Sequence, residues 1–275
     1  MSTPGSAYAM GHTDRERRRL SLQARFLNPL TQDFFVRAGI RPGMRVLDLG
    51  CGVGDVSLVA SRLVGPGGSV TGIDMDPSAL EIARERARGE GLNHAAFVHS
   101  GLLDFTAGQP FDAVTGRLIL IHTPDPRAVI RHAVSLLAPG GIIALQEGAF
   151  NRSALAGVPR PEWDRTVEAI TASMTRLCKH ADAGVQLWRL LTDAGIVDIQ
   201  SRGEVAMEGS PDTLMFEWLA ETARSIVPAD SLEFDGLGFD GLTERLRAEM
   251  IEVGGSAISP ILFAVSGRKP AASQN

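Results

Sequence analysis

The chain has 275 residues, of which 44% are hydrophobic, and it carries a formal net charge of −5. This length and apolar content suffice for one large domain or for a core with an elaborated cap, and the negative charge argues against a nucleic-acid partner, which usually requires a basic surface. Two cysteines without a C-x-x-C spacing indicate neither a disulfide framework nor a metal site, and they favour a reducing, cytoplasmic location.

The N-terminal segment is predicted to begin as a flexible tail and to continue as helix. Residues 1–13 are small and polar, and they lack the apolar core of a signal peptide. The apolar pattern that follows predicts one or two amphipathic helices over about 14–38, with the basic run 15–19 on the solvated side. No stretch of the sequence has the apolar length of a membrane span.

The first predicted strand ends next to an acid and is followed at once by three closely spaced glycines. Asp48 precedes Gly50, Gly52 and Gly54. Glycine accepts positive φ and lets a ligand approach the backbone closely, and ligands of open α/β sheets bind at the carboxyl ends of the strands. The segment therefore predicts a site for a nucleotide-like ligand.

The spacing of these glycines favours a cationic ligand over a dinucleotide. A dinucleotide fingerprint is G-x-G-x-x-G, whereas this chain has G-x-G-x-G, and Asp55 places a negative charge where a pyrophosphate would lie. An anionic phosphate is therefore disfavoured. A ligand with a sugar, a purine and a cationic centre fits an acid-flanked glycine loop better, and S-adenosylmethionine is such a molecule.

Predicted strands and helices alternate up to about residue 150, and this pattern predicts a parallel sheet covered on both faces with right-handed crossovers. Asp193–Ile199 predicts a helix end that leads into a sixth strand, and Ile258–Ser266 predicts a last, antiparallel strand. The earlier strands are predicted at 45–49, 69–74, 95–99, 111–115 and 141–147, and the helices between them at 54–63, 77–88 and 126–137.

Four segments, in their order along the chain, resemble those of the class I S-adenosylmethionine-dependent methyltransferases. They are the glycine loop, the acid-ended segment Val70–Asp76, the segment Phe111–Pro126 and the post-helix turn Leu136–Gly141. The resemblance is strong over about 40–150 and is closest to the small-molecule branch that includes quinone-biosynthesis and bacterial natural-product enzymes. It implies a Rossmann-like, doubly wound α/β fold with a seven-stranded sheet, mostly parallel with an antiparallel last strand, and S-adenosylmethionine as the cofactor.

The resemblance also implies which residues bind the cofactor. Asp74 stands 20 residues after the last glycine and would accept both ribose hydroxyls, and Arg117 would lie near the carboxylate of the methionine portion. The family usually places Gly-Asp after the third strand, but this chain has Ser100–Asp104 there, so either Asp104 reaches back to the adenine or the backbone at the start of that segment holds it. The predicted cofactor-binding residues are Asp48, Gly50, Cys51, Gly52, Asp74, Met75, Gly101, Leu102, Arg117 and His122.

Methyl transfer from a sulfonium is an in-line displacement, which gains from holding the nucleophile near the methyl carbon in a dry pocket and needs a base only for some acceptors. His122, just beyond the fourth strand, is the preferred base because the pKa of a histidine suits neutral pH. Alternatively, His122 contacts the cofactor or caps a turn. Glu147, at the end of the fifth strand, is the next candidate, unless it is merely an exposed strand-end acid. His180 is the third, and no metal ligands are predicted.

Two stretches exceed what the sheet requires. Residues 149–182 and 209–256 carry helical patterns with methionine and aromatic side chains, and connections of this length are usually functional. We interpret them, with residues 14–40, as a helical lid over the carboxyl ends of the strands and expect an aliphatic, methionine-rich acceptor pocket, although core packing would explain most of these side chains. The predicted organisation is a tail at 1–13, lid at 14–40, cofactor-binding core at 41–148, lid at 149–182, core at 183–208, lid at 209–256, the last core strand at 257–268 and a tail at 269–275.

The sequence thus predicts a methyltransferase that acts at oxygen, nitrogen or carbon of a small, mainly apolar acceptor in secondary metabolism. The alternatives are a methyltransferase-cyclase that acts on a terpenoid or polyketide alkene, a non-methylating cyclase, and a cofactor-binding protein without catalysis. No Asn-Pro-Pro-Tyr-like segment follows the fourth strand, where Leu120–Thr123 stands, and this argues against a protein or tRNA substrate. The expected partner is a small-molecule acceptor, without nucleic acid or membrane, and a homo-oligomer is left open.

Overall fold

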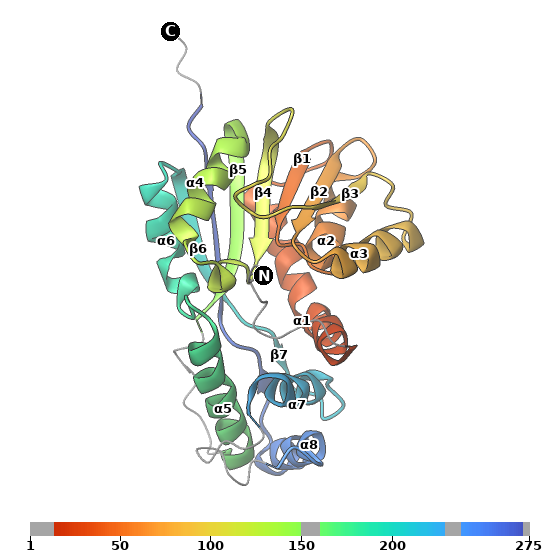
Figure 1. Cartoon of the computed structure of the whole chain (residues 1–275). Helices are drawn as coiled ribbons and strands as arrows, with labels where there is room; N and C mark the ends of the chain where they lie inside the picture. Colours follow the sequence, from red (N-terminus) through yellow and green to blue (C-terminus); the bar gives the residue numbers. More distant parts are fainter. Residues whose placement is uncertain (1–13, 150–159, 229–237, 272–275) are drawn as a thin grey trace, which may run out of the picture. The chain divides into compact units, whose positions relative to one another are not determined.

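The computed structural model describes residues 14–149, 160–228 and 238–271, and these form two compact units (Figure 1). We call them the helical unit, with residues up to 27, 149–182 and 205–261, and the sheet unit, with residues 28–148, 183–204 and 262 onward. The predicted tail at 1–13, the end of the predicted tail at 269–275 and parts of the predicted lids at 149–182 and 209–256 lie outside the described residues.

A seven-stranded sheet in the order β3-β2-β1-β4-β5-β9-β6 forms the centre of the sheet unit. Neighbouring strands from β3 to β5 pair in parallel, and β9 is antiparallel to β5 and β6. The order reverses between β1 and β4, which is the switch point where ligands of open α/β sheets bind. The predicted fold is confirmed. The strands are β1 (Arg45–Leu49), β2 (Ser69–Asp74), β3 (Ala95–His99), β4 (Phe111–Arg117), β5 (Leu137–Gly148), β6 (Val197–Glu204) and β9 (Leu262–Arg268).

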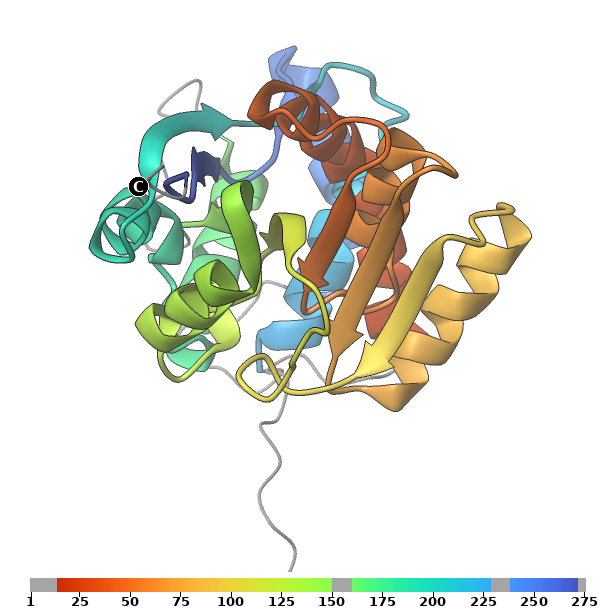
Figure 2. The ribbon, with the colours of Figure 1, turned by 90° about the horizontal axis from the view of Figure 1, so that it is seen from above.

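Helices lie against the sheet on both faces (Figure 2). On one face, Phe34 and Phe35 of α1 and Val59 of α2 form an apolar core with alternate strand residues such as Val46 and Ala113. This alternation follows from the two-residue period of a strand. The helices of the sheet unit are the second part of α1 (Asp14–Ala38), α2 (Asp55–Val64), α3 (Pro77–Gly89), α4 (Pro126–Leu136) and α6 (Ala183–Asp193), together with the 3₁₀ helix η1 (Leu120–His122).

The helical unit contains the first part of α1 with α5 (Pro161–Leu177), α7 (Met215–Ile226) and α8 (Leu242–Val253). The carboxylate of Glu249 on α8 accepts the backbone N–H groups of Glu162 and Trp163 at 2.8 Å each, which satisfies the first turn of α5. Trp163 in turn packs edge-on against Phe216 of α7, with ring centroids 6.3 Å apart. The predicted helices therefore form a packed unit, and its placement as a lid over the sheet stays a prediction.

The predicted last strand was wrong at its start. Ala257–Ile258 forms β8, which pairs with β7 (Met207–Glu208) in a separate two-stranded sheet, and β9 begins only at Leu262. Pro260 separates the two strands, because proline lacks the N–H group that a ladder needs. The division into units accordingly differs from the predicted segments: residues 205–208 and 257–261 belong to the helical unit, and residues 28–38 of α1 belong to the sheet unit.

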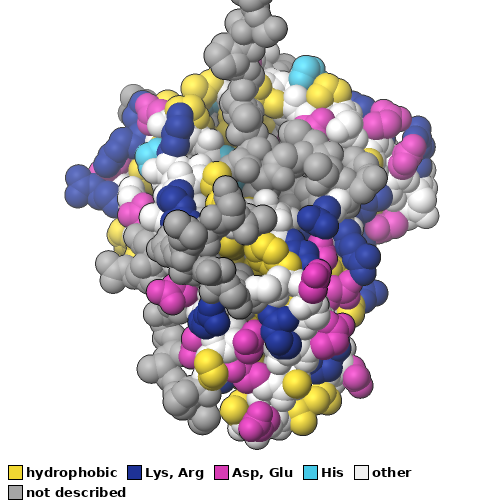
Figure 3. Space-filling view, turned by 60° about the horizontal axis from the view of Figure 1, so that its bottom comes forward, with side chains coloured by type: hydrophobic (Ala, Val, Ile, Leu, Met, Phe, Trp, Pro, Cys, Tyr) yellow, Lys and Arg dark blue, Asp and Glu magenta, His cyan; other side chains and the backbone are white. Residues whose placement is uncertain are grey.

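Charged side chains of both signs are interspersed on the face in Figure 3. In the helical unit, Arg15 and Arg18 of the predicted basic run form ion pairs with Glu221 and Glu217 of α7, so these two arginines are bound to acids of their own unit. Over the ranges that the structure describes, no helix combines the length and apolar character needed to cross a membrane.

Candidate functional site

The loop between β1 and α2 has a backbone geometry that glycine adopts most readily. Gly50, Gly52 and Gly54 have φ angles of 61°, 50° and 90°. The Cys51 N–H donates to the carbonyl oxygen of Ile73 at 2.9 Å, which ties the loop to the end of β2. The predicted glycine loop therefore lies at the carboxyl edge of the sheet, beside the switch point.

Asp74 holds the glycine loop against the end of β2. Its Oδ2 accepts the Gly52 N–H at 2.8 Å, and its Oδ1 accepts the Asp76 N–H at 2.9 Å. Each carboxylate oxygen keeps a further lone pair, so the group is oriented and can still accept two ligand hydroxyls. Asp76 in turn caps α3 by accepting the Ser78 N–H at 2.8 Å.

Asp48 lies beneath the loop, with only 1% of its surface exposed. Its Oδ2 accepts the hydroxyl of Ser57 at 2.6 Å, which joins β1 to α2, and Oδ1 lies 3.4 Å from the hydroxyl of Thr115 on β4. Burial raises the pKa of Asp48 to about 7, although Ser57, Arg117 and Thr115 act in the opposite direction. Asp48 thus organises the elements under the loop, and its direct contact with a cofactor stays a prediction.

Asp55, at the start of α2, is paired with a basic side chain of α3. Its Oδ1 accepts from Arg86 of α3 at 2.7 Å, and Arg86 also donates to the carbonyl oxygen of Val53 at 2.7 Å. Arg86 offsets the charge of Asp55, so a phosphate is disfavoured here by the glycine spacing and by the carboxylate of Asp74.

Asp104 folds back onto Gly101 after β3. A Cβ atom on Gly101 would clash with Oδ2 of Asp104, and the Asp104 N–H donates to the carbonyl oxygen of Gly101 at 3.2 Å. The Asp104 carboxylate thus lies next to Gly101, where the sequence predicts the adenine. This is the geometry expected if Asp104 reaches back, and its contact with an adenine stays a prediction.

Met75, which follows β2, is 53% exposed, and its carbonyl oxygen lies 3.0 Å from Nε2 of His99.

Arg117, at the end of β4, is partly buried and bound to α1. Its Nη1 donates to Oδ1 of Asn28 at 3.0 Å and to the hydroxyl of Thr31 at 2.8 Å. Burial lowers the pKa of Arg117, while Asp55 and Asp48 raise it. A guanidinium carries five N–H donors in a planar fork that suits a carboxylate, so this side chain could also bind the carboxylate of a ligand.

A buried polar network continues from this arginine and was missed in the sequence. Thr31 donates to Oε1 of Gln146 at 2.6 Å, and Nε2 of Gln146 donates to Glu204 of β6 at 2.8 Å. Glu204 also pairs with Arg37 of α1. The only signal was a glutamine directly after the apolar run at 142–145 of β5, and this alone does not specify its partners.

Glu147 is fully buried at the end of β5, so the exposed strand-end reading was wrong. Its Oε1 accepts the backbone N–H groups of Ile119 and Leu120 at 2.8 Å each, whereas Oε2 has no hydrogen-bond partner among the described residues. Burial raises the pKa of Glu147 to about 7 against the effect of these backbone donors.

The two predicted histidines fall in different units. His122 ends η1. Its backbone N–H donates to the carbonyl oxygen of Ile119 at 3.1 Å, so His122 lies at the same edge of the sheet as Glu147. His180 follows α5 in the helical unit. The catalytic roles of both stay predictions.

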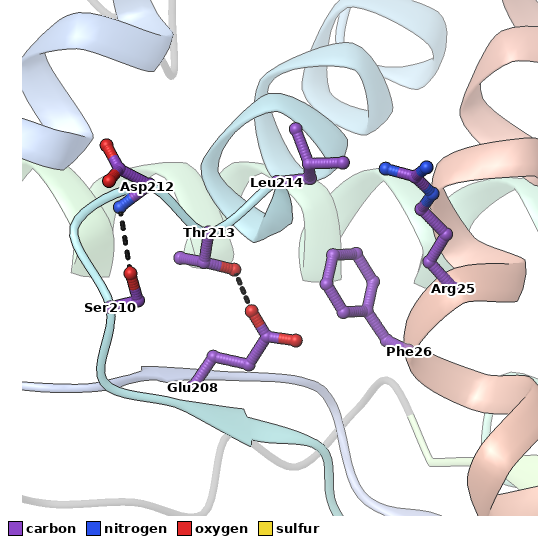
Figure 4. Close-up of a pocket in the computed structure, with 7 residues that line it drawn as sticks. All are labelled: Arg25, Phe26, Glu208, Ser210, Asp212, Thr213 and Leu214. Atoms are coloured by element: carbon purple, nitrogen blue, oxygen red, sulfur yellow. Dashed lines mark hydrogen bonds between the residues drawn. The ribbon is translucent and has the colours of Figure 1, made fainter.

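The helical unit contains a pocket of about 300 Å³ (Figure 4). Phe26 and Leu214 form its apolar wall, the guanidinium of Arg25 stands above the Phe26 ring, and Thr213 donates to Glu208 on the opposite side. Among the described residues, none of those that line it is a methionine, so this lining does not match the expected methionine-rich one.

The strand order, the glycine loop after β1 and the acid that ends β2 define the class of this protein, an α/β fold of the class I methyltransferase type. A family model described as a methyltransferase domain matches residues 40–198. The chain belongs to this family, which confirms the resemblance found in the sequence.

Curated relatives match about half of the chain. A ubiquinone biosynthesis O-methyltransferase of Xanthomonas campestris pv. campestris (strain B100) is 41% identical over 132 residues, which cover 47% of this chain and 53% of that protein. The Chromobacterium violaceum protein of the same name is 31% identical over 175 residues, covering 58% and 73%. The chain spans about half the length of the first of these relatives.

Solved structures share the fold at low sequence identity. The [4+2]-cyclase SpnF superposes with a TM-score of 0.55 and 21% identity, over 89% of this chain and 82% of that one. A phosphoethanolamine N-methyltransferase of Haemonchus contortus, solved with S-adenosylhomocysteine, gives a TM-score of 0.54 and 17% identity, over 92% and 52%. Such similarity shows the fold alone.

Proposed function

We propose that this protein transfers a methyl group from S-adenosylmethionine to a small, mainly apolar acceptor. The observation that carries the proposal is the contact between Asp74 and Gly52, which places an oriented carboxylate beside a glycine loop at the switch point of the sheet. Membership of the methyltransferase domain family supports methyl transfer as the reaction.

The residues of the sheet unit fit this cofactor by their chemistry. Asp74 would accept the ribose hydroxyls, Asp104 the adenine amino group, and Arg117 would bind the methionine carboxylate. Asp48, buried below, would support the loop, and Met75 is exposed next to Asp74 for contact with the adenine. When bound, the cofactor supplies an electrophilic methyl group on a sulfonium.

The protein's own part in the reaction is positioning and, for a hydroxyl acceptor, removal of a proton. His122 is the base that we propose, because it lies at the carboxyl end of β4 and its residue type titrates near neutral pH. Glu147 is less suited, since one of its oxygens binds two backbone donors.

Side chains of the helical unit support the proposal that the acceptor has an apolar body and at least one oxygen atom. Phe26 and Leu214 provide an apolar pocket wall, and Trp218 packs against Phe26 with ring centroids 6.2 Å apart. The indole N–H of Trp218 is buried and has no acceptor within the described part of the chain. Because such a donor is costly to leave unpaired, we infer that it is available to an oxygen of the acceptor.

The two relatives named above favour methylation at oxygen and a phenol or hydroquinone as the acceptor class. A place in natural-product biosynthesis, a cytoplasmic location and the absence of a nucleic-acid partner belong to the same proposal, and the acidic net charge supports the last of these. Cyclisation without methyl transfer is the second candidate, because SpnF shares the fold, but a shared fold does not specify chemistry.

The test is production of S-adenosylhomocysteine with a panel of alkyl-substituted phenols and hydroquinones. The proposal predicts turnover that requires both the donor and an acceptor, with a mass increase of one methylene in the product. A changed carbon skeleton without S-adenosylhomocysteine would support the cyclase alternative. Donor binding without turnover of any acceptor would support a cofactor-binding protein.

A further inference from the structure

The turn that follows β4 is held by two consecutive residues of β5. The Leu118 N–H donates to the carbonyl oxygen of Gln146 at 2.8 Å, and the next two N–H groups, of Ile119 and Leu120, donate to Oε1 of Glu147. Three successive backbone donors therefore depend on one short stretch of the neighbouring strand. Two of them depend on a single carboxylate oxygen.

The backbone at this turn has a conformation that needs such support. Leu118 has a φ of 54°, in the left-handed region that side chains other than glycine rarely adopt. Residues in such conformations persist where the surrounding structure fixes them. Here the surrounding structure is the end of β5, with Glu147 fully buried beneath the turn.

The turn places the side chain of Ile119 against the glycine loop. A Cβ atom on Gly50 would lie 2.7 Å from Cγ1 of Ile119, and one on Gly116 would lie 3.2 Å from its Cγ2. Gly50 is therefore required for two reasons, its φ of 61° and the contact with Ile119. The first glycine of the loop and the turn after β4 fit one another closely.

We propose that Glu147 is a positioning residue for the cofactor, which fixes the turn after β4 so that Ile119 packs on Gly50 and holds the glycine loop in its binding shape. The inference rests on the proposed cofactor site at this loop. It assigns Glu147 an action through Ile119 rather than direct proton transfer, because its side chain is fully buried and its Oε1 is occupied by two backbone donors of the turn.

The test compares Glu147→Gln and Glu147→Ala in the full chain, with Glu81→Gln on the exposed face of α3 as the control. Two quantities are measured: the Kd for S-adenosylmethionine by calorimetry and hydrogen exchange at the amides of residues 119 and 120. For Glu147→Ala we expect exchange and Kd each to rise by at least about tenfold, because the two backbone N–H groups of the turn lose their shared acceptor. Glu147→Gln keeps an oxygen acceptor, so we expect its Kd to stay within about threefold of that of the unaltered chain.

A folded Glu147→Ala protein with unchanged exchange and Kd would overturn the proposal. So would a Glu147→Gln protein with normal Kd but kcat lowered by about 100-fold or more, since this would identify a base. If Glu147→Ala does not fold, Ile119→Ala decides: it retains the backbone contacts, and an unchanged Kd would refute the role of Ile119. Failure of the unaltered chain to bind S-adenosylmethionine would instead contradict the proposed cofactor, while the exchange measurement would still test the contact between Glu147 and the turn.

Discussion

The carboxylate of Asp74 accepts the backbone N–H of Gly52 at 2.8 Å. These two residues lie on consecutive strand-to-helix connections, and each was identified in the sequence for a separate reason, the glycine for its spacing and the acid for its place at a strand end. Their contact joins the glycine loop and the acid at the end of β2 into a single site. It also means that a change at Asp74 affects both a ligand contact and the shape of the loop.

Asp104 should bind the adenine amino group. Replacement of Asp104 by alanine removes a hydrogen bond to a neutral amine, which is worth on the order of 1 kcal/mol, so the Kd for S-adenosylmethionine should rise about fivefold. Calorimetry of Asp104→Ala beside Asp112→Ala, an acid bound to the backbone of Arg45 at the start of β1, measures this. Equal affinities of the two variants would show that the backbone holds the adenine instead.

Arg117 should bind the cofactor carboxylate in addition to α1. Arg117→Ala should raise the Kd for S-adenosylmethionine by at least about tenfold, because it removes a charge-assisted contact. Thr31→Val is the matched control, since it removes an acceptor of Arg117 and leaves the guanidinium in place. Its Tm should fall while its Kd changes by less than about threefold. An effect of the same size on Kd in both variants would mean that Arg117 acts only by holding α1.

Glu147 should make the stability of the protein depend on pH. Its pKa is raised from 4.5 to about 7 in the folded protein, so its protonated form favours folding below pH 4.5 and this contribution is lost as the pH rises to about 7. The full loss amounts to roughly 3 kcal/mol. Urea unfolding between pH 4 and pH 8 should therefore give a flatter profile for Glu147→Gln than for the unaltered protein. Parallel profiles would be evidence against a buried titrating carboxyl group.

Trp218 should contribute to acceptor binding and not to cofactor binding. Trp218→Phe keeps the ring that packs on Phe26 and deletes the unpartnered indole N–H. Loss of one hydrogen bond to a neutral oxygen predicts a KM for the acceptor about fivefold higher, with an unchanged Kd for S-adenosylmethionine. Steady-state kinetics with the best phenol of the panel provide the measurement, and an unaltered KM would refute the assignment.

Much of the sheet unit could be predicted because its signals are local. Gly50 and Gly54 mark a turn by residue type, and Asp76 and Asp125 cap helices through donors two or three residues away. The start of β9 was misplaced because the pattern from Ile258 onward has strand character on both sides of Pro260. The pairing of Ile258 with Met207 in a separate sheet joins positions far apart in the sequence.

The rest of the site depends on contacts between distant positions. The carboxylate of Glu147 meets the amide of Ile119 28 residues away, and Arg117 meets Asn28 across 89 residues. No spacing or periodicity records such pairs, because they arise from the packing of β5 and α1 against β4. The position of the helical lid could not be predicted from the sequence either. An amphipathic helix shows the same apolar pattern whichever neighbour its apolar face packs against.

The most direct test of the central claim is the Kd for S-adenosylmethionine of the unaltered chain and of Asp74→Ala, measured by calorimetry. The account predicts binding by the unaltered chain and a Kd about 100-fold higher for the variant, since the ribose loses a charged acceptor and the Gly52 N–H loses its partner. Equal affinities in a folded variant would contradict the assignment of the cofactor to the glycine loop and Asp74.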